Sequence, residues 1–117
     1  MKKEKLYLVH IIEASAKIKE YMPDSLEKFG QNSMAQDAII KQLSNITESA
    51  SNLEKMSKDS YPDIPWEKIR GMRNILVHDY LGTLSHEEVW KTVRNDLPVL
   101  VDVAKKILKE KYNIQIE

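Results

Sequence analysis

Apolar residues recur at alternating steps of three and four along almost the whole chain, which is the spacing of amphipathic α-helices. Neither proline nor glycine interrupts the two N-terminal runs, and the only alternating strand pattern, at residues 114–116, is too short to build a sheet. The period predicts helices over 3–22, 33–58, 65 to 79 or 80, and 85 to about 111. The chain is therefore expected to be all-α.

Capping signals and one proline refine these boundaries. Ser85 followed by Glu88 has the spacing of a capping box, as do Asp24 with Glu27 and Ser33 with Gln36. Pro98 lies inside the last run, so we expect a kink or break near 95–96 that divides it into two helices. The short connections then predict an antiparallel bundle of four to five helices.

Length and charge limit the possible classes of protein. The chain has 117 residues, 42% of them hydrophobic, so residues 1–117 are expected to form a single domain. Eighteen basic and eighteen acidic residues balance, and with no cysteine and only three histidines no metal-ligand spacing is present. No stretch is apolar enough for a signal sequence or a membrane span, so a cytoplasmic location without membrane contact is expected.

The segment 70–80 carries residues that a merely stable helix would not need. On a helical wheel Gly71, Asn74 and His78 share one face, while Arg73 and Tyr80 lie two turns apart at the edge of the apolar face. A glycine inside a helix costs about 1 kcal/mol relative to alanine, and one reason to retain it is the close approach of another backbone. This helix is therefore the first candidate for a functional site.

Each of these residues also has a structural explanation. His78 would interact favourably with the last carbonyl groups of its helix, and Arg73 could extend its guanidinium from an apolar edge into water. Asn74 could simply be solvated, Tyr80 could pack into the core, and Gly71 could ease a helix crossing. Spacing alone leaves both interpretations open.

Residues 73–80 resemble the signature of the HEPN superfamily, which has an arginine followed by a polar residue, then a histidine, one residue and a tyrosine. Nearly the whole chain is similar to the HepT-like subgroup, although that subgroup usually has glycine in place of Thr47 and alanine in place of Ser49. The other segments that carry the resemblance are 65–72 (PWEKIRGM), 36–43 (QDAIIKQL), 89–90 (VW) and 96–100 (DLPVL).

The resemblance implies a metal-independent endoribonuclease that acts as a homodimer and needs no cofactor. Arg73 would clamp the phosphate, His78 would act in proton transfer or orient the phosphate, and Asn74 would orient both. Gly71 would allow the motif helices of two subunits to approach closely. RNA can supply its own 2′-hydroxyl as nucleophile, so neither serine nor cysteine is required. The RNA is not specified, and tRNA is a plausible target.

The HepT-like subgroup further implies a toxin–antitoxin partner. Its members are toxins encoded beside a minimal nucleotidyltransferase, here called MNT, which transfers AMP to the tyrosine of the motif, Tyr80 in this chain. The added phosphate charge beside Arg73 would occupy the clamp and repel RNA.

Two alternatives belong to other functional classes. The chain could be a non-catalytic HEPN module that binds a nucleotide or a nucleotidyltransferase, or a helical dimerisation domain whose motif is incidental.

Overall fold

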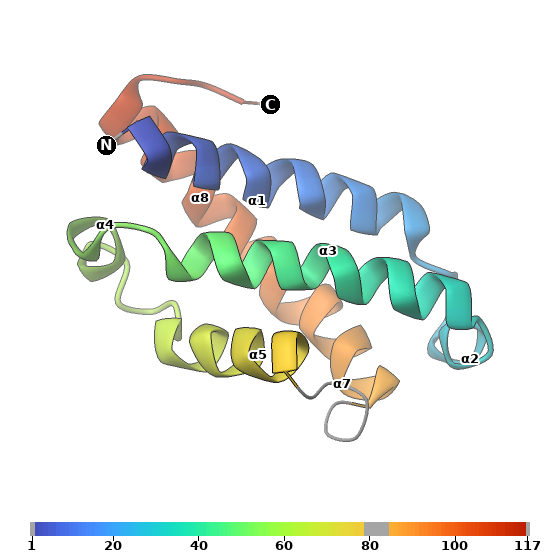
Figure 1. The fold of residues 1–117 in the computed structure, drawn as a ribbon. Coiled ribbons are helices and arrows are strands. Elements are labelled where there is room, and N and C mark those ends of the chain that lie inside the picture. The colour runs from blue at the N-terminus through green and yellow to red at the C-terminus, as the bar shows by residue number, and fades with distance from the viewer. Residues whose placement is uncertain (1, 79–84, 117) are drawn as a thin grey trace.

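The computed structural model describes residues 2–78 and 85–116, and it gives the backbone alone for Lys2, Val77 and His78. Four long helical segments make up the described chain, and short helices join the first three (Figure 1). In chain order the elements are α1 (Lys2–Tyr21), α2 (Leu26–Gly30), α3 (Ser33–Ser51), α4 (Lys55–Asp59), α5 (Trp66–His78), α7 (His86–Lys91), the π-helical turn η1 (Thr92–Asp96) and α8 (Leu97–Tyr112).

Successive long helices run in opposite directions, so the predicted all-α antiparallel architecture is confirmed for the described residues. Helix α3 lies between α1 and α5 and packs against both, while α8 packs against α1 and crosses behind α3 (Figure 1). None of the described helices combines the length and apolar composition that a bilayer span needs. The site-bearing helix α5 is therefore an outer helix of the bundle, supported mainly by α3.

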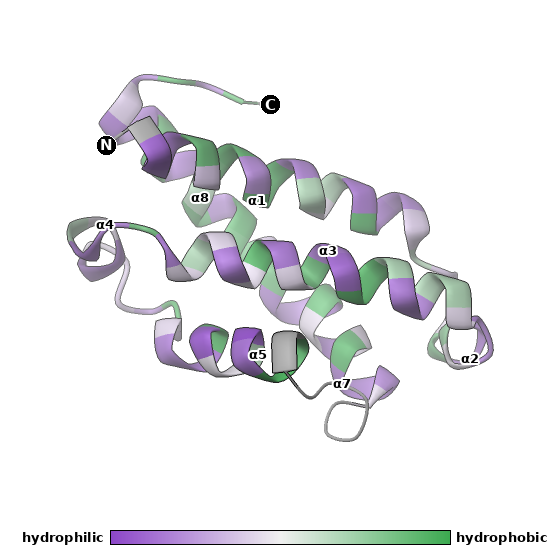
Figure 2. Cartoon of the chain, in the orientation of Figure 1, coloured by the Kyte–Doolittle hydropathy of each residue, from purple (hydrophilic) through white to green (hydrophobic). Residues whose placement is uncertain are grey.

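The long helices carry an apolar stripe between polar residues, as the hydropathy colouring shows (Figure 2), and it is the apolar stripe that is buried. This is the distribution that the three-four spacing predicts. The largest fully buried apolar side chains come from five of the helices and are Phe29, Leu8, Ile11, Ile18, Ile39, Leu43, Ile46, Leu108 and Val89.

The local signals at the last helical segment are confirmed. Ser85 caps α7 in the predicted capping box with Glu88. Near Pro98 the chain does not break but widens into the π-helical turn η1, in which the N–H of Leu97 bonds to the carbonyl of Thr92. A proline ring clashes with the carbonyl four residues earlier in a regular α-helix, and a π-turn is one way to relieve that clash. In two other places the cap lies one residue from the predicted position, at Ser25 instead of Asp24 and at Asn32 instead of Ser33.

The prediction of one helix over 33–58 is wrong, because α3 ends at Ser51. The backbone N–H of Asn52 turns back to the carbonyls of the last helical turn, and the N–H of Glu54 donates to the Glu4 carboxylate at 2.8 Å. In a continuing helix the N–H of Glu54 would bond to a carbonyl of the preceding turn. It bonds instead to the carboxylate of Glu4, fifty residues away along the chain. Helix periodicity carries no record of such a contact.

Glu4 forms the centre of a charged cluster at this end of the bundle. Its side chain is buried, with 1% exposed, and Lys111 Nζ lies 2.8 Å from one carboxylate oxygen, which also accepts a hydrogen bond from the Tyr112 hydroxyl. Burial by itself would raise the pKa of Glu4, but the hydrogen bonds from Lys111 and Tyr112 outweigh it and, with further donors, lower the pKa from 4.5 to about 2. The buried carboxylate therefore remains charged at neutral pH.

This cluster predicts an acid-sensitive step in stability. Because the pKa of Glu4 is lower in the folded chain than in the unfolded chain, its contribution is complete above pH 4.5 and is lost as the pH falls towards 2. The loss is on the order of 3 kcal/mol. Urea unfolding between pH 6 and pH 2.5 should show it, and Glu4→Gln should be less stable at pH 6 with a flatter pH dependence. Exposed Glu13 provides the control, Glu13→Gln; equal slopes for Glu4→Gln and wild type would contradict the assignment.

Candidate active site

Helix α5 is fixed on the bundle by its apolar face and by its first residue. Leu76 is buried, and Ile69 and Met72 are half-buried against the core, so the face predicted from the sequence is confirmed. At the start of the helix the indole N–H of Trp66 donates to the carbonyls of Lys58 and Tyr61, both at 3.0 Å. These contacts set which side of α5 faces α3 and which side faces outward.

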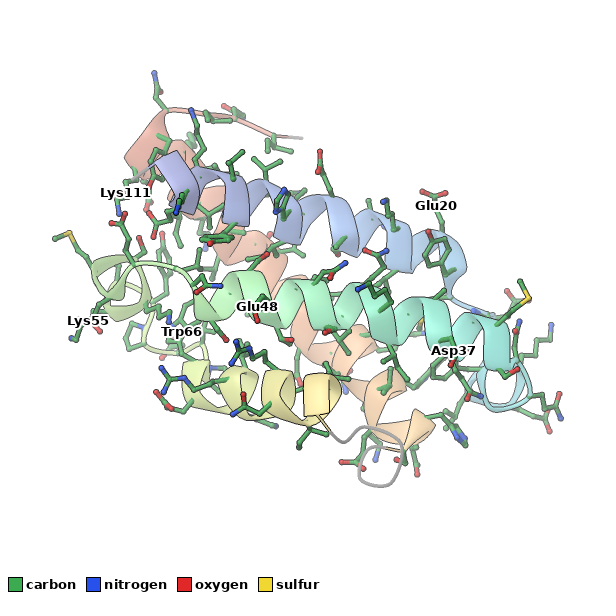
Figure 3. The ribbon with its side chains drawn as sticks, viewed as in Figure 1. Glu20, Asp37, Glu48, Lys55, Trp66 and Lys111 are labelled. Carbon is green, nitrogen blue, oxygen red and sulfur yellow. The ribbon has the colours of Figure 1, made fainter. Side chains whose placement is uncertain are left out.

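Arg73 reaches from α5 to α3, where its Nε donates to Oε1 of Glu48 at 2.7 Å. Both side chains are partly exposed, Arg73 by 35% and Glu48 by 46%. Glu48 is labelled on the central helix in Figure 3, on the side that faces α5. No role for Glu48 is predicted from the sequence. The two residues lie 25 positions apart, and no local spacing could have connected them.

Glu48 is in turn restrained by its own helix. Asn52, one turn later, donates from Nδ2 to Oε2 of Glu48 at 3.0 Å and to the Glu48 carbonyl at 3.0 Å. The hydrogen bond from Arg73 and then that from Asn52 lower the pKa of Glu48 below its ordinary value, against a smaller opposing effect of burial. A half-exposed ion pair contributes about 0–1 kcal/mol to folding, so the main effect of this one is on geometry.

Asn74 contacts the same guanidinium from the other side. Its Oδ1 accepts a hydrogen bond from Nη1 of Arg73 at 3.1 Å, and the Asn74 side chain lies at the surface. Among the described residues Nη2 of Arg73 has no hydrogen-bond partner. The structure therefore brings two of the predicted site residues together and leaves one edge of the guanidinium available to an anion, for which its planar fork of donors is suited.

Gly71 lies on the exposed side of α5. A Cβ atom built at this position would meet no other atom within 4 Å, so packing within the described chain does not require a glycine. A crossing with another described helix of the same chain therefore does not explain it. The predicted role in approach between two subunits is not tested by a single chain, and it stays a prediction.

The structure describes less of the other two predicted site residues. His78 is the last residue of α5, and its backbone follows Asn74 by one helical turn. Tyr80, the predicted modification site, lies outside the described residues. The described site therefore consists of the Arg73–Asn74 pair and Glu48, with the position of His78 at the end of the same helix.

In the described ranges no three His, Cys, Asp or Glu side chains gather in a way that could hold a metal ion. The donors that do gather are a guanidinium and a carboxamide, which together suit an oxyanion such as a phosphodiester.

We compared the chain with known protein families and proteins. The family model for "Ribonuclease HepT-like" proteins matches residues 11–107. A Thermococcus cleftensis protein named "Probable ribonuclease HepT" is 35% identical, over 88% of this chain and 94% of its own length. A candidate RNase of Caldanaerobacter subterraneus is 32% identical, over 94% of this chain and 98% of its own length.

A longer relative from Methanocaldococcus jannaschii, named as a gamma-glutamylcyclotransferase and candidate RNase, is 35% identical over 94% of this chain, which spans 53% of that protein. No solved structure gives a significant match. The match to the family covers most of the chain and both site-bearing helices, and it confirms the nuclease class expected from the motif. The chain belongs to the HepT-like ribonuclease family.

Proposed function

We propose that the protein is an endoribonuclease toxin that cleaves RNA without a metal ion, through Arg73, Asn74 and His78. The observation that supports this most strongly is the Arg73 guanidinium, held by Glu48 and Asn74 and with no described residue on Nη2, in a chain of the HepT-like ribonuclease family. A fixed guanidinium at the protein surface is suited to a phosphate of the RNA backbone. Pooled tRNA is the first substrate to test.

The reaction that fits these groups uses the 2′-hydroxyl of the substrate. The 2′-oxygen forms a bond to the adjacent phosphorus, the bond from phosphorus to the 5′-oxygen breaks, and the products are a 2′,3′-cyclic phosphate and a 5′-hydroxyl end. His78 either transfers a proton, taking it from the 2′-hydroxyl or giving it to the leaving 5′-oxygen, or orients the phosphate. Arg73 stabilises the negative charge that develops on the phosphorane, and Asn74 keeps Arg73 aligned.

The active form in this proposal is a homodimer in which the α5 helices of two copies face each other. The chain has no net charge, so RNA would be attracted only by local groups of positive charge. Two Arg73 side chains, one from each copy, would give a stronger positive potential at one phosphodiester than a single Arg73. The exposed Gly71, at which a Cβ would meet no atom of the other described elements within 4 Å, is where the two backbones would come close.

The partner in this proposal is an MNT-type nucleotidyltransferase that acts as antitoxin. It would transfer AMP from ATP to the Tyr80 hydroxyl: the phenolic oxygen bonds to the α-phosphorus, pyrophosphate leaves, and the phenolic proton is released. Tyr80 follows the end of α5 by two residues, so the new phosphate would lie within the motif that carries Arg73. The added negative charge would compete with RNA for the guanidinium.

Cleavage tests the catalytic assignment. Purified Arg73→Ala and His78→Ala should keep the helical content of the wild type and lose RNA cleavage by about 100-fold or more, because each removes a group that acts on the transition state. The assay is release of 2′,3′-cyclic phosphate ends from pooled tRNA in the presence of EDTA.

The matched control for this assay is His10→Ala, because His10 is exposed on α1 and away from α5. Cleavage at the wild-type rate by purified His78→Ala would refute the assignment. Intact tRNA after induction of the wild-type protein, together with binding of a nucleotide or of the nucleotidyltransferase, would favour the non-catalytic module instead.

Gly71→Ala separates the folding and dimer roles of this position. The added methyl group meets no atom within 4 Å in the described residues outside its own helix, so the variant monomer should gain up to about 1 kcal/mol of stability from better helix propensity. The same methyl group should weaken the dimer if two α5 backbones meet there. Sedimentation equilibrium measures the dimer dissociation constant, and thermal unfolding measures the stability. A dissociation constant equal to that of the wild type would show that Gly71 is not in the interface.

Tyr80→Phe tests the modification. After co-expression with the nucleotidyltransferase encoded beside it, the wild type should gain mass in steps of one AMP unit, while Tyr80→Phe should gain none because it lacks the phenolic oxygen. Intact-mass spectrometry measures this, and Tyr21→Phe is the control because Tyr21 is 39% exposed on another helix. AMP units that survive on Tyr80→Phe would place the modification elsewhere.

A further inference from the structure

Glu48 lies outside the motif on α3, and its carboxylate accepts a hydrogen bond from the motif residue Arg73 on α5. We propose that Glu48 is a positioning residue of the reaction, which fixes the guanidinium of Arg73 so that its outer edge meets the scissile phosphate. The proposal rests on the proposed ribonuclease function. The contact that carries it joins two helices, because Glu48 belongs to α3 and Arg73 to α5.

The pattern of donors on Arg73 supports positioning. Nε of Arg73 donates to Oε1 of Glu48 at 2.7 Å, and Nη1 donates to Oδ1 of Asn74 at 3.1 Å. Within the described residues Nη2 has no partner and Nη1 has one N–H beyond the one given to Asn74, so the guanidinium keeps donors for a phosphate, which it can bind through two N–H groups. Glu48 and the substrate would thus bind different edges of one guanidinium.

Two further features make Glu48 a suitable anchor. Its second oxygen is held by Asn52 at 3.0 Å, so the carboxylate is restrained on both sides. It also lies in the last turn of α3, the helix that packs against both α1 and α5 (Figure 3). An arginine side chain has several rotatable bonds, and a clamp that must be ordered during binding loses part of its binding free energy. Glu48 has already paired Arg73 before the RNA arrives.

The opposite possibility is that Glu48 blocks the site by competing with the phosphate. A carboxylate that blocked the clamp would be expected to cover the two terminal nitrogens in a bidentate pair. The structure shows Glu48 on Nε instead, with Nη2 unpaired in the described part of the chain. The two ideas predict opposite effects when Glu48 is removed.

The test compares Glu48→Ala, Glu48→Gln and Glu48→Asp in steady-state cleavage of pooled tRNA. Glu48→Ala should lower kcat by about 10- to 100-fold with little change in KM, the size of effect that a misplaced catalytic group produces. Glu48→Gln keeps an oxygen acceptor at the same distance and should recover much of the rate. Glu48→Asp keeps the charge but shortens the reach, and it should resemble Glu48→Ala. The thermal unfolding midpoint should change little.

Two controls make the result specific. Glu20→Ala removes an exposed carboxylate from α1, far from α5 in Figure 3, and should leave kcat unchanged. Arg73→Ala distinguishes the two proposals: if it cleaves normally, the proposed function fails. If it is inactive while Glu48→Ala and Glu48→Asp cleave at the wild-type rate, the positioning role alone is overturned. A lower KM with faster cleavage in Glu48→Ala would overturn it as well, in favour of a blocking role.

Discussion

The direction that the chain takes after α3 depends on the buried carboxylate of Glu4. That carboxylate accepts the N–H of Glu54, and α3 ends three residues before it, at Ser51. Lys111 and Tyr112 bind the same carboxylate, so the N-terminal helix, the turn after α3 and the end of α8 meet at one point. Because α3 stops there, α5 can return alongside it instead of continuing in a new direction.

The return of α5 along α3 assembles the candidate site. Arg73 lies near the middle of α5 and Glu48 near the end of α3, and antiparallel packing brings their side chains to 2.7 Å. A loop could not hold a long side chain with the same accuracy, because loops are more mobile than packed helices. The neutral chain thus acquires a fixed cationic group through local geometry, without any excess of basic residues.

Elements whose controlling interaction is local were predictable from the sequence. The three-four spacing indicated the long helices, the Ser85 box starts α7, and Pro98 follows an irregular turn. The end of α3 was not predictable in this way, because the acceptor for Glu54 comes from residue 4. No proline or glycine marked that position.

The candidate site also contains residues that the sequence predicts and one residue that it does not. Arg73 and Asn74 are sequence neighbours, and the motif resemblance was enough to propose them together. Glu48 contacts Arg73 from another helix, and only the packing of α3 against α5 shows it. In the sequence, Glu48 lies between two departures from the family pattern, Thr47 and Ser49, and no local spacing indicates a role for its carboxylate.

The most direct test of the account is whether the guanidinium of Arg73 binds an RNA phosphate. Nitrogen-15 NMR of arginine side chains can follow it during titration with a 2′-O-methylated RNA, which cannot be cleaved because its 2′-hydroxyl is blocked. In the free protein the Arg73 side chain should already be ordered by its hydrogen bond to Glu48, so its Nε–H signal should be visible. The chemical shifts of its guanidinium should change as RNA is added and reach a plateau at saturation. Arg94, stacked over Trp90 on the last helical segment, should shift little. Shifts confined to other arginines, with Arg73 unchanged at saturation, would contradict it.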